Sequence, residues 1–328
     1  MITTFLNRLR ARKQFFRRAF SNFVWLGSRA TNQLVAKHLG LVEVRHSGQI
    51  NHDGKFLVLI CMSRDEKELL QLWIKHHSRL IEVGAIVLID HCSMESIRLT
   101  DFFLSKSISY YQYRFDYNSH LQAHVLNQVS RQLAHRYPNA VFLPLDTDEF
   151  LPDVEARTII ASKIEIGYLK WRLVYPVELF SSEHVGQRFP SFENVMVMPR
   201  CFGGNKHFVL ARKIRLGARW SQGAHVAYNC LGFPLKGNCL GSIIHIPVQS
   251  SKQIYAKLLR GTSVHDHPAL DMRDSKGDRI IGNHWFVNGL SSQSNKNFLE
   301  ESLLKYYDGA LVGQRQFLWQ DLISGQIQ

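Results

Sequence analysis

Short apolar runs alternate with amphipathic stretches through the first half of the chain. The runs Phe56 to Met62 and Ala85 to Ile89 are continuous, which is typical of parallel strands buried on both faces. Between them, residues 66–81 carry Leu69, Leu70, Trp73 and Ile74 at helical spacing, with Ser63 and Asp65 placed as N-caps. The pattern predicts a β-α-β unit that opens a doubly wound α/β sheet.

The pattern continues with a strand at 108–115, a helix at 119–137 and an apolar strand, Ala140 to Leu145. Beyond Pro152 it is more mixed, with strands expected at 167–175, 208–216 and 243–246 and a helix at 250–260. We therefore expect an α/β fold with a Rossmann-like, mostly parallel sheet and a mixed α+β second half. The expected divisions are a basic amphipathic segment at 1–54, the two halves of one domain at 55–152 and 153–290, and a C-terminal helical segment at 291–328.

Three polar clusters stand where predicted strands end. They are residues 63–66 (Ser-Arg-Asp-Glu), 90–93 (Asp-His-Cys-Ser) and 146–149 (Asp-Thr-Asp-Glu). Ligands of open α/β sheets bind beyond the carboxyl ends of the strands. The coincidence predicts one site at this edge.

Asp146 and Asp148 are alternate residues at a strand exit, and neighbouring carboxylates repel unless a cation or hydrogen-bond donors neutralise them. Mg²⁺ and Mn²⁺ bind carboxylate oxygens and keep positions open for substrate phosphates. The pair therefore suggests a metal and diphosphate site. A plain polar exit from the strand, with Asp as a turn former, is the alternative.

Three segments carry a resemblance to a known family: FLVLICMSRDEKELLQLWIKHH, AIVLIDHCSMES and AVFLPLDTDEFL. Together they are similar to bacterial family-2-type glycosyltransferases, including the related family 92, across roughly residues 55–152. The resemblance implies a GT-A fold, a nucleotide-activated sugar donor (a UDP-sugar is favoured) and inversion at the anomeric carbon. It also implies nucleotide contacts from Arg64, Asp65, Glu66 and Asp90, and metal-diphosphate contacts from Asp146 and Asp148. Asp65, His91 and Glu95 depart from the family's usual residues, which leaves the nucleotide open.

The second half carries fainter echoes of the same family. They suggest His225 and His245 as further ligands of Mn²⁺ or Mg²⁺, and Lys213 and Lys257 as partners of the diphosphate. Trp171 and Trp285 are candidates for stacking on a sugar, or ordinary core residues.

Inverting transfer needs a carboxylate that accepts the acceptor's proton. The candidates are Glu178, Glu183 and Asp266, and the sequence does not choose among them. Glu149 either joins the site or hydrogen-bonds its own loop.

Composition adds a net charge of +13 and a pI of about 9.6, which favour an anionic partner. Residues 1–42 are basic and place Phe5, Leu9, Phe16, Phe20 and Phe23 on one side of a helix. That helix either lies on an anionic membrane surface or packs on the main domain.

No apolar run is long enough to span a bilayer, no signal peptide is evident, and the five scattered cysteines fit a reducing compartment. The sequence thus predicts a cytoplasmic, metal-dependent glycosyltransferase, either free or peripheral on the inner face of the cytoplasmic membrane. The expected acceptor is a glycan or lipid-linked glycan of capsule or lipopolysaccharide type. No nucleic-acid-binding motif is found. The alternatives are a non-catalytic glycan- or anion-binding protein and a phosphohydrolase of the haloacid-dehalogenase type.

Overall fold

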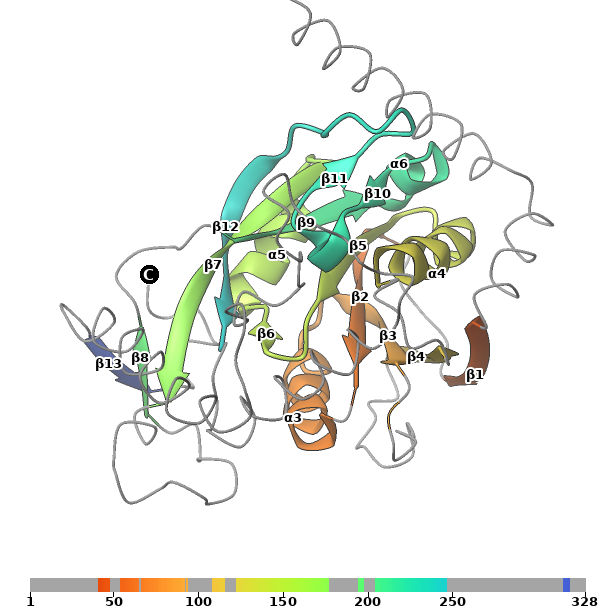
Figure 1. Ribbon diagram of the computed structural model, residues 1–328. Helices are drawn as coiled ribbons and strands as arrows, with labels where there is room; N and C mark the ends of the chain where they lie inside the picture. Colours follow the sequence, from red (N-terminus) through yellow and green to blue (C-terminus); the bar gives the residue numbers. More distant parts are fainter. Residues whose placement is uncertain are drawn as a thin grey trace, which may run out of the picture.

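The computed structural model describes residues 41–47, 54–64, 66–91, 93, 108–115, 122–176, 194–197, 204–246 and 315–318. Their strands form a mixed sheet in the order β1-β4-β3-β2-β5-β9-β7-β12-β6, accompanied by helices (Figure 1). The expected α/β class is confirmed.

The first part of the sheet is parallel. Strands β2 (Phe56–Ser63), β3 (Val83–His91), β4 (Ser109–Phe115) and β5 (Ala140–Leu145) run in one direction. Helices α3 (Lys67–His77) and α4 (Gln122–Arg136) connect them. Strand β1 (Leu41–Ser47) pairs antiparallel with β4, so residues 41–47 belong to this sheet.

The second part is mixed. Strand β9 (Asn205–Leu210) runs antiparallel to both β5 and β7 (Ile166–Pro176), and β12 (Asn238–His245) lies parallel to β7. The two-residue strand β6 (Glu149–Phe150) pairs with β12. The remaining elements are α5 (Asp153–Ala161), β8 (Asn194–Val197), α6 (Ala211–Arg215), β10 (Arg219–Trp220), η4 (Gln222–Ala224), β11 (Ala227–Tyr228) and β13 (Arg315–Leu318).

Three local predictions were wrong. Residues 291–328 were expected to be helical, but residues 315–318 form strand β13, which pairs antiparallel with β8. The strand expected over 208–216 ends at Leu210 and turns into α6, where Ala211 and Ile214 are buried three residues apart, a helical spacing. The helix expected to Ile81 ends at His77, and Ile81 is 85% exposed. Its N-cap is Glu66, without a side-chain cap bond. Residues 41 and 42, the end of the segment expected to be helical at 1–42, are part of strand β1. Residues 1–40 and the helix expected at 250–260 lie outside the described residues.

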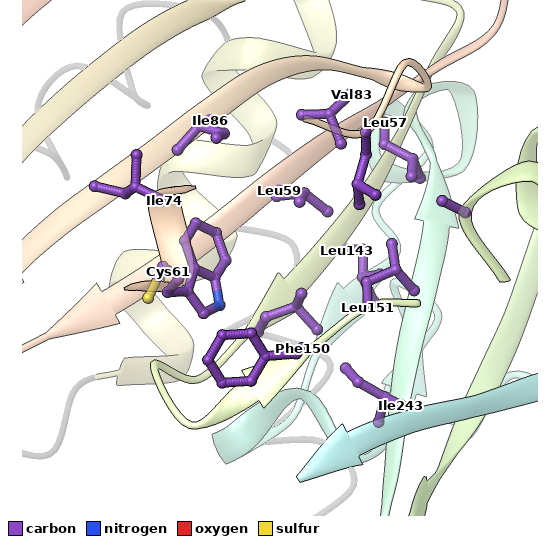
Figure 2. Packing of buried hydrophobic residues seen from close by; sticks show 14 of the residues in the cluster. Leu57, Leu59, Cys61, Ile74, Val83, Ile86, Leu143, Phe150, Leu151 and Ile243 are labelled. Atoms are coloured by element: carbon purple, nitrogen blue, oxygen red, sulfur yellow. The ribbon is translucent and has the colours of Figure 1, made fainter. Parts of the chain in front are cut away.

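The sheet has a hydrophobic core on each face because successive side chains of a strand point to opposite sides. In β2, Leu57, Leu59 and Cys61 belong to one core, whereas Val58 and Ile60 belong to the other. Figure 2 shows Phe150 and Leu151 packed into the first core near Leu59 and Leu143. The two residues after the acidic cluster are therefore fixed by burial.

The burial of Phe150 predicts a large loss of stability on truncation. Phe150→Ala is expected to lower the free energy of unfolding by about 3–5 kcal/mol, measured by urea denaturation, because it removes a fully buried ring and leaves a cavity. Ile81→Ala is the control, since truncating an exposed side chain changes stability by less than about 0.5 kcal/mol. Equal losses in the two variants would contradict the anchoring role of Phe150.

Candidate functional site

The three polar clusters meet at one edge of the sheet. Strands β2, β3 and β5 are neighbours, and their register pairs Ser63 with Asp90 and Cys61 with Leu145. The hydroxyl of Thr147 donates a hydrogen bond to the carboxylate of Glu66, which links the first cluster to the third. The convergence predicted from the strand ends is confirmed.

A buried lysine holds the acidic cluster together. The Nζ of Lys206 lies 2.6 Å from Asp146 Oδ2 and 2.9 Å from Glu149 Oε2. Lys206 is 1% exposed and Glu149 is fully buried. The Glu149 Oε2 also accepts a hydrogen bond from the Asp146 backbone N–H at 2.8 Å, so Glu149 does bond its own loop.

These contacts set the pKa values of the pair. Burial raises the pKa of Glu149 to about 7, against the opposing effect of Lys206. Burial alone would lower the pKa of Lys206, but Asp146 and then Glu149 raise it above its usual range. The raised pKa keeps the Lys206 ammonium charged. Its positive charge makes the burial of these carboxylates tolerable.

Strand pairing brings His245 to Asp148. Residue His245 pairs with Glu149 between β12 and β6, and the Ile246 N–H donates to the Asp148 carbonyl at 2.8 Å. The His245 Nε2 then lies 3.6 Å from Asp148 Oδ2, which is longer than a hydrogen bond. The two side chains face each other without direct bonding between these atoms.

An indole ring supports His245 from the side. The ring centroids of Trp171 and His245 are 4.3 Å apart, and those of Trp171 and His225 are 5.1 Å apart. A Cβ at Gly204 would overlap the Trp171 ring, so glycine at that position allows the indole to pack there. Trp171 thus serves packing among site residues.

Two adjacent histidines of α3 hold the backbone that follows the acidic cluster. The His76 Nε2 donates to the Leu151 carbonyl at 2.8 Å, and the His77 Nε2 accepts from the Leu151 N–H at 3.1 Å. The His77 Nδ1 therefore carries the proton and donates to the Trp73 carbonyl at 2.9 Å. Both polar groups of the Leu151 backbone are satisfied by side chains of one helix.

The carboxylates of the cluster share one electrostatic environment. Burial, followed by Asp146, Glu66, Asp148 and Glu149, raises the pKa of the Cys61 thiol well above its usual range. Four carboxylates therefore act on one point at the end of β2. Lys206 lies within contact distance of only two of them in the described part of the chain.

Some residues predicted for the site lie at its edge, and others lie elsewhere. Asp90 ends β3, where its Oδ1 accepts a hydrogen bond from the Ser93 N–H at 3.2 Å. Arg64 follows β2 directly. The remaining predicted residues, Asp65, Glu178, Glu183, Lys257, Asp266 and Trp285, lie outside the described residues.

The structure does not bring Lys213 to the acidic cluster. Its Nζ lies 3.1 Å from Glu165 Oε2, just before β7. Because Leu210 pairs with Val141, the end of β9 and the α6 helix after it lie at the start of β5, opposite the strand ends of the site. The sequence match to a diphosphate-binding lysine is thus not supported by position.

His225 packs against Trp171 and, among the described residues, is not part of a group of three or more side chains that could hold a metal. Its Nδ1 bonds the Asn205 carbonyl at 3.0 Å, and a Cβ at Gly223 would meet its Nε2 at 2.6 Å. Both ring nitrogens therefore face backbone. The contact with Trp171 makes His225 a support of that indole.

A divalent cation would fit Asp148 and His245 better than the predicted set of four. Both side chains supply atoms that Mn²⁺ accepts, and the 3.6 Å separation leaves the pair unbridged. The Asp146 Oδ2 is held by Lys206, and the described residues contain no group of three or more His, Cys, Asp or Glu side chains placed to hold a metal. The other ligands would have to be water and substrate oxygens, as is usual for Mg²⁺.

Three functional residues were missed from the sequence. Lys206 lies in an apolar strand pattern, where its charge requires a buried carboxylate, and that requirement is the signal available. His76 and His77 form a His-His pair at the end of α3. The local sequence gives no sign of their role, which depends on their contacts with Leu151.

The chain has no match among known family models or among curated proteins. Within the described residues, no helix has the length and apolar character needed to cross a membrane.

The buried histidines predict loss of stability in acid. Burial lowers the pKa of both histidines below 6.5. For His76, Asp153 opposes this shift and Arg79 adds to it. For His77, the neighbouring His76 adds to it. As the pH falls, the histidines of the unfolded chain take up protons before the buried ones do. Their contribution to the free energy of unfolding is therefore fully present above about pH 6.5 and decreases below it. The loss grows as the pH falls below 6.5 and is larger for His77, whose pKa is lowered further, as measured by urea denaturation at a series of pH values.

His77→Gln is expected to flatten this pH dependence, because a glutamine does not titrate. His135→Gln changes an exposed histidine of α4 and is the matched control, with the slope of the unmodified protein. An unchanged slope in His77→Gln would refute the assignment.

Lys206, Asp146 and Glu149 form an ion triad, and their contacts predict strong energetic coupling between them. Lys206→Met is expected to cost about 3–5 kcal/mol in the free energy of unfolding, because it leaves Glu149 buried and unpaired. Adding Glu149→Gln to Lys206→Met should restore part of the loss, since the buried charge is removed. Strict additivity in a double-mutant cycle would contradict the coupling.

Proposed function

We propose that the chain is a metal-dependent glycosyltransferase of the GT-A class. It transfers a sugar from a nucleoside diphosphate donor, with a UDP-sugar favoured, to a hydroxyl of a glycan. The observation that supports this most is the meeting of Asp148 and His245 at the carboxyl edge of a parallel sheet. The sequence pattern independently predicts a metal and diphosphate site at this edge of the sheet.

The edge provides separate positions for the parts of the donor. The polar ends of β2 and β3, with Arg64 and Asp90, are assigned to the nucleoside. Asp148 and His245 are assigned to a cation that binds the diphosphate. Asp146 is assigned to the ribose or to a water on the metal, because Lys206 holds one of its oxygens and the side chain remains 37% exposed.

The reaction balances as a substitution at the anomeric carbon. The acceptor oxygen forms a new bond to that carbon as the bond to the diphosphate oxygen breaks, and the nucleoside diphosphate leaves with the electron pair. The acceptor proton passes to a carboxylate, for which Glu178, Glu183 and Asp266 remain the candidates. A bound Mn²⁺ or Mg²⁺ would supply positive charge that offsets the charge of the leaving diphosphate.

The protein's own residues keep this geometry fixed. Glu149, Lys206 and the two histidines on Leu151 fix the backbone on both sides of Asp148. Such preorganisation favours catalysis because the charged groups need not reorganise during the reaction.

A phosphohydrolase with Asp146 as nucleophile is less well supported. Three parallel strands precede β5 along the chain, whereas that enzyme type carries its Asp pair after the first core strand. The neighbouring ammonium at 2.6 Å also ties one oxygen of Asp146 into the buried triad.

The decisive experiment is calorimetric titration of UDP, GDP and CDP, each with Mn²⁺ and with EDTA. One nucleotide is expected to bind in the presence of Mn²⁺ only. Asp148→Asn and His245→Gln should each weaken that binding by about 10-fold or more, because each removes a metal ligand.

Asp153→Asn is the matched control. Asp153 is an exposed carboxylate near the acidic cluster, paired with Arg157 at 3.3 Å, and its loss should leave the affinity within about twofold. The proposal fails if no nucleotide binds with Mn²⁺, or if Asp148→Asn leaves both binding and donor hydrolysis unchanged.

A further inference from the structure

A second cavity lies away from the acidic site, between α4 and the hairpin of β10 and β11. Figure 1 shows these elements side by side, with α6 next to them. The cavity has a volume of about 320 Å³, the lower end of the range for small-molecule sites. Its lining is Ala123, His124, Asn127, Arg131, Ala218, Arg219, Trp220, Ser221, Tyr228 and Gly232.

The walls of this cavity are tied together by hydrogen bonds. The Asn127 Nδ2 donates to the Trp220 carbonyl at 3.0 Å, and the Trp220 N–H donates back to Asn127 Oδ1 at 2.8 Å. The Trp220 indole N–H donates to the His207 carbonyl at 2.9 Å, which joins the hairpin to β9. The helix and the hairpin therefore form one rigid wall.

The rim beside Tyr228 is also fixed. The Asn229 Oδ1 accepts from the N–H groups of Leu231 and Phe233, at 2.9 and 3.0 Å. Gly232 between them has a φ of +87°, a conformation that glycine adopts without strain. The cavity mouth is thus preformed.

The lining is cationic. Arg131 and Arg219 both line the cavity with His124, and the lining contains no Asp or Glu among the described residues. Arg131 is only 9% exposed. After burial itself, the charge of Arg219 lowers the pKa of both Arg131 and His124, so the three groups are close enough to disfavour one another's charge.

We infer that this cavity binds the phosphate or carboxylate group of a small anionic ligand. Guanidinium groups match the planar or tetrahedral oxygen arrays of these anions. The volume suits an anion carried by one sugar-sized ring, with Tyr228 beside it. The ligand class is therefore a small organic phosphate or carboxylate, of which glucose 6-phosphate and glucuronic acid are representatives. The site is distinct from the acidic cluster because Ala218 and Trp220 belong to the core on the opposite face of the sheet from Phe150.

The test is calorimetric titration of the full chain with three probes: inorganic phosphate, glucose 6-phosphate and glucuronic acid. Glucose is the neutral control, and EDTA is present throughout to suppress metal-dependent binding at the acidic site. Preference for glucose 6-phosphate identifies phosphate as the anion, and preference for glucuronic acid identifies carboxylate.

Arg219→Gln is expected to weaken binding of the preferred probe by about 10-fold or more, as the loss of a charged hydrogen bond would. Arg131→Gln should have a similar effect, and Arg219, which is half-buried, provides a variant that tests the site if Arg131→Gln does not fold. Arg157→Gln removes an exposed arginine of α5 and should keep the affinity within about twofold.

Three outcomes overturn the inference. They are the absence of binding by all three anions at about 10 mM, equal affinity in Arg219→Gln and the unmodified protein, and binding of glucose as tight as that of the anions.

Discussion

The burial of Lys206 between Asp146 and Glu149 is the constraint on which the arrangement of the acidic edge depends. A charge at 1% exposure is tolerable only with close partners, and both partners come from the loop that leaves β5. Lys206 belongs to β9, so the ion triad fixes the mixed second part of the sheet against the parallel first part. The loop conformation and the strand packing are therefore one energetic unit.

Contacts from α3 and from β12 fix the same segment on either side. His76 and His77 hold Leu151 from α3, and β12 holds Glu149 and Phe150 from the other side. The acidic segment thus has a backbone fixed by a helix and a strand that are far apart in sequence. Asp148 is positioned by its neighbours, so its carboxylate faces His245 without being drawn into the lysine triad. A carboxylate held in a fixed position beside a histidine is what the proposed cation site requires.

The first half of the fold was predictable because its strands are buried on both faces, and continuous runs such as 56–62 have few other interpretations. The meeting of the strand ends followed from parallel topology alone. The second half was less accessible. β9 ends at Leu210 because Ala211 and Ile214 favour a helix, a short-range signal that the apolar run hides. Lys206, His76 and His77 acquire their roles only from partners 57 to 75 residues away, a separation that no local pattern encodes.

The same strand β9 also explains how the chain can carry opposite charges on its two faces. Lys206 and Phe208 point toward the core that contains Phe150, whereas Val209 belongs to the other core and the His207 carbonyl receives the Trp220 indole. The acidic cluster and the cationic cavity are therefore supported by adjacent residues of one strand and separated by the sheet. Arg131 and Arg219 therefore lie on the other side of the sheet from the acidic edge. This separation limits the electrostatic interaction between the proposed cation site and the proposed anion site, so one sheet can carry both.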